Sequence, residues 1–168
     1  SKFHFKNGKV LLKENNFNEA VTNKLSMKFY SENKDIHFIS NEWNDISLQE
    51  RCKRERELYK KNETMFISIH ADAFHIKDKA TGSTFFYKSE RGKVLATHFT
   101  KVFNDNGYPL KMREPKKANF TVLTDTKSPA ILFEAGFMTT TTDLNYLLDD
   151  GFRNLCAELL YKAITTVK

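Results

Sequence analysis

The sequence predicts an α/β protein in which a mostly parallel, twisted sheet is flanked by helices in a single three-layer domain. Two observations support this prediction. Segments of strand-like composition alternate with helical patterns along the chain, which is typical of layered α/β folds. The 168 residues include only six glycines and three prolines, with no internal repeat or linker. One domain with a sizeable core therefore accounts for the whole chain.

The helical patterns differ in what defines them. From Asn15 to Tyr30, apolar residues recur at every fourth position and form one helix face. Ser47 and Glu50 make a capping-box pattern, which predicts the start of a highly charged helix that reaches about Lys61. Three further helices are predicted at residues 92–106, 143–148 and 152–165.

Short apolar runs predict strands at residues 36–40, 65–70, 83–87, 119–123 and 130–133. The run from Met65 to His70 shows little alternation, which favours a strand buried on both faces of a parallel sheet. In such sheets, functional sites gather at the carboxyl ends of strands. We expect His70 to end one strand and Glu134 to end another. A carboxylate in that second position is costly unless it is paired, metal-bound or functional.

Composition narrows the classes of partner. The net charge of +6 and the pI near 9.2 favour nucleic acid, anionic lipid or an acidic cell-wall polymer, or they reflect only a solvated basic face. No arginine-rich helix or RNP-like aromatic stretch is present, so we expect no nucleic-acid binding. No apolar run approaches the ~20 residues of a membrane span. Cys52 and Cys156 lie in predicted helices outside any CxxC motif, which favours free thiols over a thiolate zinc site or a disulfide.

Three residues are candidates for a common site, although each has a structural explanation of its own. Glu14 stands at the entry to the first predicted helix, where the helix dipole alone favours an acidic residue. His70 follows an apolar run, where a histidine usually finds local hydrogen-bond partners. Together with Glu134, however, they suit a catalytic zinc site. Such a site has a few histidine and carboxylate ligands, an open position for water and a nearby carboxylate for proton transfer.

Several motifs resemble one enzyme family. They are LLKENNFN, SLQER with Arg51, FISIHADA, and ANFTVLTDTKSPAILFE running into PAILFEAGFM, which Asp143 follows. In this order and at these separations, they resemble the zinc-dependent N-acetylmuramoyl-L-alanine amidases, a family that includes bacterial and phage cell-wall lysins. The resemblance extends from about Glu14 to Leu160.

The resemblance implies that residues 1–168 form an amidase catalytic domain that binds one Zn²⁺ per chain. It implies that Glu14 is a carboxylate ligand, His70 a histidine ligand and Glu134 the catalytic glutamate. The bond cut would be the amide between N-acetylmuramic acid and L-alanine of the stem peptide. Arg51 matches a position that we interpret as structural. Asp72 either orients His70 or caps the turn after it, and we favour the cap.

One family feature has no match here. The family opens with a strand and a Gly-His-Gly-type turn that carries the first zinc ligand, whereas this chain begins SKFHFKNGKVLLKE. The missing histidine lies upstream of Ser1, or has been lost in a protein that only binds, or is replaced by His4. Because Glu14, His70 and Glu134 are all present, we favour a ligand upstream of Ser1.

The implied partner is peptidoglycan, and we expect a monomer that works outside the cytoplasm. The location would be extracellular, cell-wall or periplasmic, or that of a phage lysin released at lysis. A non-catalytic peptidoglycan-binding relative and a zinc carboxypeptidase acting on wall peptides are the alternatives. The segments 77–83 and 111–117 line a substrate groove or are solvated surface.

Overall fold

A four-stranded sheet with the order β3–β6–β4–β5 lies at the centre of the protein. The structure, a computed structural model, describes residues 3–6, 9–40 and 46–167, with side chains from Leu12 onward. The strands β3 and β6 are parallel, as are β4 and β5, whereas β4 and β6 are antiparallel. The predicted α/β class is confirmed, with a mixed sheet in place of a mostly parallel one. The strands are β3 (Phe66–Asp72), β4 (Thr84–Tyr87), β5 (Lys116–Lys117) and β6 (Ala130–Phe137).

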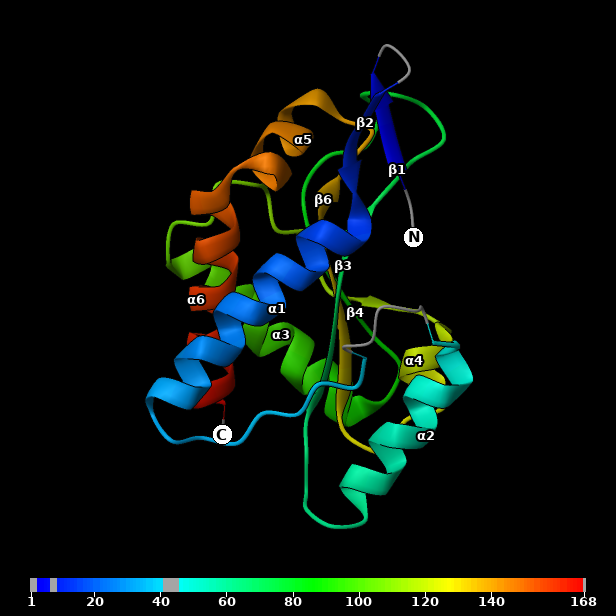
Figure 1. Cartoon of the computed structure of the whole chain (residues 1–168), viewed down its shortest axis with the longest axis vertical. Coiled ribbons are helices and arrows are strands. Elements are labelled where there is room, and N and C mark those ends of the chain that lie inside the picture. The colour runs from blue at the N-terminus through cyan, green and yellow to red at the C-terminus, as the bar shows by residue number, and fades with distance from the viewer. Residues whose placement is uncertain (1–2, 7–8, 41–45, 168) are drawn as a thin grey trace.

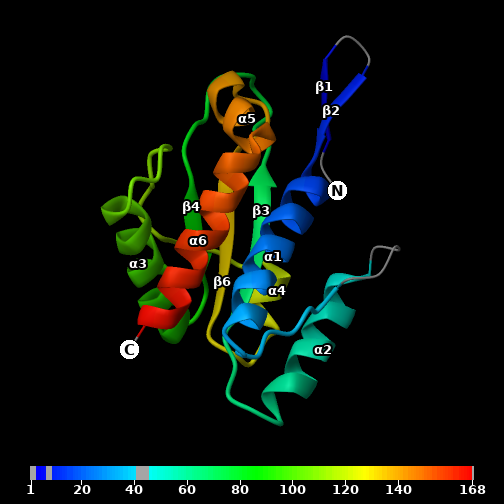
Figure 2. The ribbon, with the colours of Figure 1, turned by 60° about the vertical axis from the view of Figure 1, so that its left-hand side comes forward.

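Helices cover both faces of this sheet and give three layers (Figure 1). One face carries α1 (Glu14–Ser31), α3 (Glu90–Asp105) and α6 (Asp150–Thr166), and the other carries α2 (Leu48–Tyr59) and the short α4 (Thr121–Thr124), as Figure 2 shows from a second side. Helix α5 (Thr141–Leu148) connects β6 to α6.

The side chains of β6 alternate between the two outer layers. Ile131 and Phe133 belong to the larger apolar cluster beneath α1, α3 and α6. Ala130 and Leu132 belong to the smaller cluster that α2 and α4 cover. All eight residues of β6 are buried, so this strand forms the spine of the core.

The position of β3 differs from the prediction. It is an edge strand with β6 as its only neighbour in the described sheet, and within it only Phe66 and Ala71 are fully buried. The prediction of burial on both faces was wrong, because an apolar run without alternation does not distinguish an edge from a centre. Nor do His70 and Glu134 end their strands, since β3 continues to Asp72 and β6 to Phe137.

Two other predicted strands were wrong. Residues 36–40 form no strand; Ile36 packs against the larger cluster and Ile39 against the smaller one, so their burial explains the apolar pattern without strand pairing. Within residues 119–123, the chain turns into α4. This helical turn buries Val122 and Leu123 in the cluster that contains Cys52.

The predicted helix cap at Ser47 and the predicted free cysteines agree with the structure. The Ser47 hydroxyl accepts from the Glu50 backbone N–H at 3.1 Å, as the capping pattern predicted. Both cysteines are free and buried. The strands β1 (Phe3–Lys6) and β2 (Lys9–Lys13) form an unpredicted antiparallel pair that extends beyond the helical layers (Figure 2). In the part of the chain that the structure describes, no helix is long and apolar enough to cross a membrane.

Candidate active site

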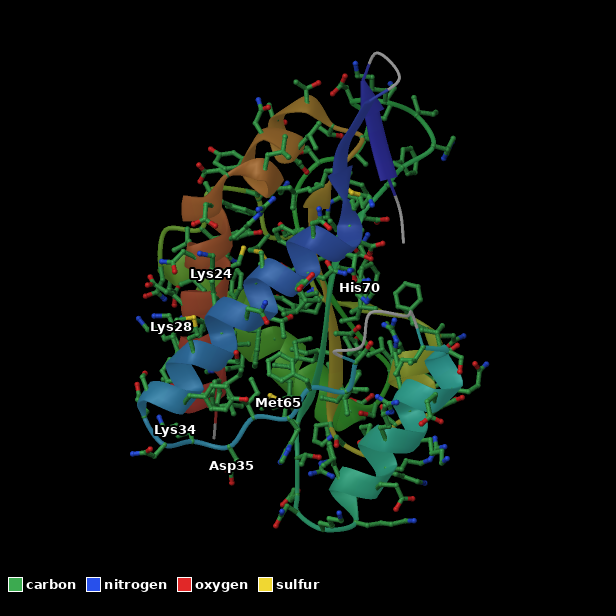
Figure 3. The ribbon with its side chains drawn as sticks, in the orientation of Figure 1. Lys24, Lys28, Lys34, Asp35, Met65 and His70 are labelled. Atoms are coloured by element: carbon green, nitrogen blue, oxygen red, sulfur yellow. The ribbon has the colours of Figure 1, made fainter. Side chains whose placement is uncertain are left out.

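His70 and Glu14 meet although they come from different elements. Glu14 is the first residue of α1 and is 6% exposed, and His70 lies on β3 beside the N-terminal end of that helix (Figure 3). The Nδ1 atom of His70 is 2.8 Å from Oε1 of Glu14. The expected convergence of these two side chains is therefore present in the fold.

Ser68 contacts the other nitrogen of the same ring. Its Oγ lies 2.7 Å from Nε2 of His70, two residues along β3. Residues i and i+2 of a strand share a face, so this contact follows from strand geometry. A carboxylate only accepts hydrogen bonds, so Nδ1–H donates to Oε1 of Glu14 and Nε2 accepts from the Ser68 hydroxyl. With a metal held between Glu14 and His70, the ring would take the other tautomer: Nε2–H would donate to the Ser68 hydroxyl, and Nδ1 would offer its lone pair to the metal.

Glu134 lies on the adjacent strand at the level of His70. The two are register partners in the parallel pair of β3 and β6, so their side chains leave the same face of the sheet. Thr84, on the other side of β6, is the antiparallel partner of Glu134 and is 4% exposed. The Glu134 side chain is itself buried, at 8% exposure. A carboxylate in this environment is held in one place by the sheet.

The peptide group after Glu134 is held by two hydroxyl groups. The carbonyl oxygen of Ala135 accepts from Ser83 Oγ at 2.7 Å and from the Tyr108 hydroxyl at 2.9 Å. Burial raises the pKa of Tyr108 well above its usual value, so the phenol stays protonated and can donate. These contacts fix the backbone next to the candidate catalytic carboxylate.

The other predicted residues occupy different surroundings. The carboxylate of Asp72 accepts from the backbone N–H of the next residue, Ala73, at 2.7 Å. Arg51 lies on α2, where its Nε donates to the Ile46 carbonyl at 3.3 Å. The backbone of His4 lies in β1, but its ring lies outside the described side chains, as does any residue upstream of Ser1.

The donor set can be compared with what zinc requires. Catalytic zinc sites in proteins usually have three protein ligands from histidine, carboxylate or thiolate. Glu14 and His70 supply two donors of the right type. Among the described residues, no group of three or more such side chains could hold a metal ion. The pair therefore fits part of a zinc site that needs a further ligand.

Sequence reasoning did not identify Ser68 or the buried carboxylate of Asp143 as supports of this region. Asp143 is fully buried and accepts from the backbone N–H of Phe137 at 3.0 Å and from that of Gly82 at 2.9 Å. A serine two residues before His70 on one strand was a usable signal. The contact of Asp143 with Gly82 joins residues far apart in the chain, so no local sequence pattern predicts it.

Comparisons with known proteins identify the family of this chain. The family model of N-acetylmuramoyl-L-alanine amidase matches residues 5–166. The probable cell wall amidase LytH of Staphylococcus aureus is 28% identical over 95 residues, which cover 56% of this chain and 32% of that protein. The chain thus spans about a third of the length of the curated relatives it matches.

Two solved structures are also similar. The catalytic domain of CwlV, an amidase from Bacillus (Paenibacillus) polymyxa var. colistinus, is 25% identical with a TM-score of 0.84, covering 94% of this chain and 88% of that one. An N-acetylmuramoyl-L-alanine amidase from Clostridium difficile 630 is 26% identical with a TM-score of 0.80, covering 92% and 83% of the two chains. Because the family model covers nearly the whole chain, this protein belongs to the N-acetylmuramoyl-L-alanine amidase family.

Proposed function

We propose that residues 1–168 are the catalytic domain of a zinc-dependent peptidoglycan amidase. The reaction is hydrolysis of the amide between N-acetylmuramic acid and L-alanine of the stem peptide. The observation that supports the proposal is the contact between Glu14 and His70, with Glu134 as the register partner of His70 on the neighbouring strand, in a chain of this family. We expect the protein to act as a monomer outside the cytoplasm, as a cell-wall enzyme or as a lysin.

Glu14 and His70 would hold the zinc ion, through Oε1 and Nδ1. The third ligand would be a histidine upstream of Ser1, with the ring of His4 as the weaker candidate. When bound, zinc supplies Lewis-acid chemistry, polarising an amide carbonyl and lowering the pKa of water. Ser68 would keep the proton of His70 on Nε2.

Glu134 would act as the proton carrier. Its position on the same face as His70 suits a carboxylate that accepts the proton of the attacking water. The C–O bond would form as Glu134 takes this proton. The same proton would then pass to the leaving nitrogen of L-alanine, and the C–N bond of the amide would break in this second step. The fixed backbone at Ala135 would limit movement of this carboxylate during the transfer.

Replacing Glu134 tests this assignment. We expect Glu134→Gln to lower kcat by about 100- to 10,000-fold, because general acid–base catalysis contributes about that much. The side chain keeps its size, so binding of the substrate should be preserved. The measurement is release of intact stem peptide from purified muropeptides, followed by mass spectrometry. Equal rates in the parent and variant proteins would exclude Glu134 as the proton carrier.

The same digests separate the alternatives. An amidase frees the whole stem peptide from the sugar, and a zinc carboxypeptidase removes one terminal residue. A non-catalytic peptidoglycan-binding relative leaves the muropeptide unchanged. This last alternative is kept because the described residues supply only two of the expected metal donors.

A further inference from the structure

Arg113 is held rigidly although it lies at the surface in a basic run. Its Nε and Nη2 both donate to the Thr81 carbonyl, at 2.9 and 2.6 Å. Its Cζ lies 5.0 Å from the centroid of the Phe137 ring, within the range of a cation–π contact. A partly exposed arginine normally samples many rotamers, and these two contacts restrict it to one position.

Both supports of Arg113 are tied to the same buried carboxylate. Asp143 Oδ1 accepts from the Thr81 hydroxyl at 2.6 Å, and Oδ2 accepts from the backbone N–H of Phe137 at 3.0 Å. Oδ2 also accepts from the N–H of Gly82 at 2.9 Å. Since Asp143 is fully buried, the two residues that contact the guanidinium, Thr81 and Phe137, are themselves bonded to a group in the protein core.

Strand alternation places Arg113 on the face of the candidate active site. Met112 forms a parallel bridge with Ser83 and packs into the larger apolar cluster. The backbone N–H of the next residue, Arg113, donates to the Ser83 carbonyl at 2.8 Å, so the extended pairing continues past this isolated bridge and the Arg113 side chain faces the side opposite to Met112. Thr84 is the partner of Glu134 across β4 and β6. The guanidinium and the candidate catalytic carboxylate thus share one face.

The Phe137 ring under Arg113 marks the same side. Phe137 is the register partner of Asp72, and Asp72 follows His70 by two residues on β3. The register of the two strands shifts between His70 and Asp72, so the pair of Asp72 and Phe137 lies on the same face of the sheet as the pair of His70 and Glu134. Arg113 therefore lies beyond Glu134 in the direction of the carboxyl ends of β3 and β6.

The positive charge of Arg113 is not neutralised by an ion pair within the described residues. None of the ion pairs among them includes this guanidinium. A guanidinium has five N–H donors in a planar fork, and two of its nitrogens already donate to Thr81. The remaining donors match the geometry of a carboxylate.

We propose that Arg113 binds a carboxylate of the stem peptide and so sets a preference for stems that carry one; this inference rests on the proposed amidase function. The carboxyl group of muramic acid is consumed in the bond to be cut. The peptide side of that bond, in contrast, ends in free carboxyl groups. A fixed cation beyond Glu134 therefore suits the peptide and not the sugar.

The test measures binding, so that it does not depend on turnover. Protein carrying Glu134→Gln is titrated with two muramoyl peptides of the same sequence, one with free side-chain and terminal carboxyl groups and one with carboxamides in their place. We expect about tenfold or greater preference for the carboxylate form, the size of one charge-assisted contact. Adding Arg113→Gln should abolish the preference and leave the affinity for the carboxamide unchanged.

Two further variants serve as controls. Lys93→Gln removes the same charge from an exposed site on α3 and should keep the full preference. Arg113→Lys keeps the charge but not the fork, so it should retain only part of the preference. If Arg113→Gln melts at a lower temperature because Thr81 and Phe137 lose their contact, the lysine variant decides.

The outcomes are distinct. Three results would overturn the inference. The Glu134→Gln protein could bind both peptides with equal affinity or bind neither, or both Arg113 variants could keep the full preference. If the protein without any substitution cleaves neither peptide, but the Glu134→Gln protein shows the Arg113-dependent preference, the amidase function fails and the carboxylate site stands. If cleavage occurs without any preference, the function stands and the site fails.

Discussion

At the residue scale, the ring of His70 is the most constrained group of the candidate site. One nitrogen faces Glu14 at 2.8 Å and the other faces Ser68 at 2.7 Å. A zinc-binding imidazole commonly gives its second N–H to a neighbouring acceptor, which fixes the tautomer and the ring plane. Ser68 is placed to be that acceptor.

Removing the Ser68 hydroxyl should therefore weaken metal binding. We expect Ser68→Ala to lower zinc affinity by about 10- to 100-fold, the usual effect of losing such a partner. The measurement is competition for zinc with a chromogenic chelator, on protein whose intact mass shows which residues are present. Ser68→Thr keeps the hydroxyl and should restore most of the affinity. Unchanged affinity in the alanine variant would assign Ser68 a purely structural role.

The sequence could propose Glu14, His70 and Glu134 as one candidate site, because a helix start and two neighbouring apolar runs carry them, although His70 and Glu134 lie within their strands and do not end them. It could not show that Arg113 is fixed, because a basic run has the same appearance whether its side chains are mobile or held. The contacts that hold Arg113 come from Thr81 and Phe137, and both depend on Asp143. Such long-range contacts have no periodic pattern along the chain.

At the scale of elements, the buried carboxylate of Glu55 joins α2 to the start of β6. It is 2% exposed and accepts from the backbone N–H groups of Lys127 and Ser128 at 3.0 and 2.7 Å. Both donors precede β6, which begins at Ala130. Glu55 therefore fixes how the chain enters the central strand.

Loss of this contact should destabilise the fold. We expect Glu55→Ala to lower the free energy of unfolding by about 2–4 kcal/mol, because one buried and one partly buried N–H group lose their acceptor. Urea denaturation followed by circular dichroism measures the change. Glu57→Ala, on the exposed side of the same helix, is the matched control and should not move the midpoint. Equal midpoints for the two variants would contradict the role of Glu55.

Elements with a clear period were predictable, and short apolar runs were not. The fourfold spacing in α1 reflects a single buried helix face, which only a helix explains. Residues 36–40 and 119–123 have the composition of strands but reach the core as an irregular segment and as the turn α4. Their burial is set by packing, and packing does not fix secondary structure over so few residues.

At the scale of the whole molecule, Phe85 connects the sheet to its larger helical layer. Its ring stacks on Phe133 at 4.6 Å between centroids and meets the edges of Phe99 and Phe103 at 5.6 and 5.3 Å. It therefore contacts two residues of α3 and one of β6. The sequence contains fifteen phenylalanines, but composition alone does not show which of them form one cluster.

A cavity at this position should affect the entire domain. We expect Phe85→Ala to lower the free energy of unfolding by about 3–5 kcal/mol, the usual cost of deleting a buried ring. Thermal and urea melts, read by both near- and far-ultraviolet circular dichroism, measure it. Phe120→Ala, whose ring is 41% exposed, should cost clearly less. A larger loss at Phe120 would show that the smaller cluster dominates stability.

The pairing of β3 with β6 also governs when the site can exist. His70 and Glu134 become neighbours only when two strands far apart in the chain align in parallel. Closing so long a loop costs entropy before any contact repays it, and such non-local contacts slow folding. Helices such as α1 form through local contacts and do not wait for this step. Catalytic geometry is therefore regained after unfolding at the pace of strand alignment, and not at the pace at which helical content returns.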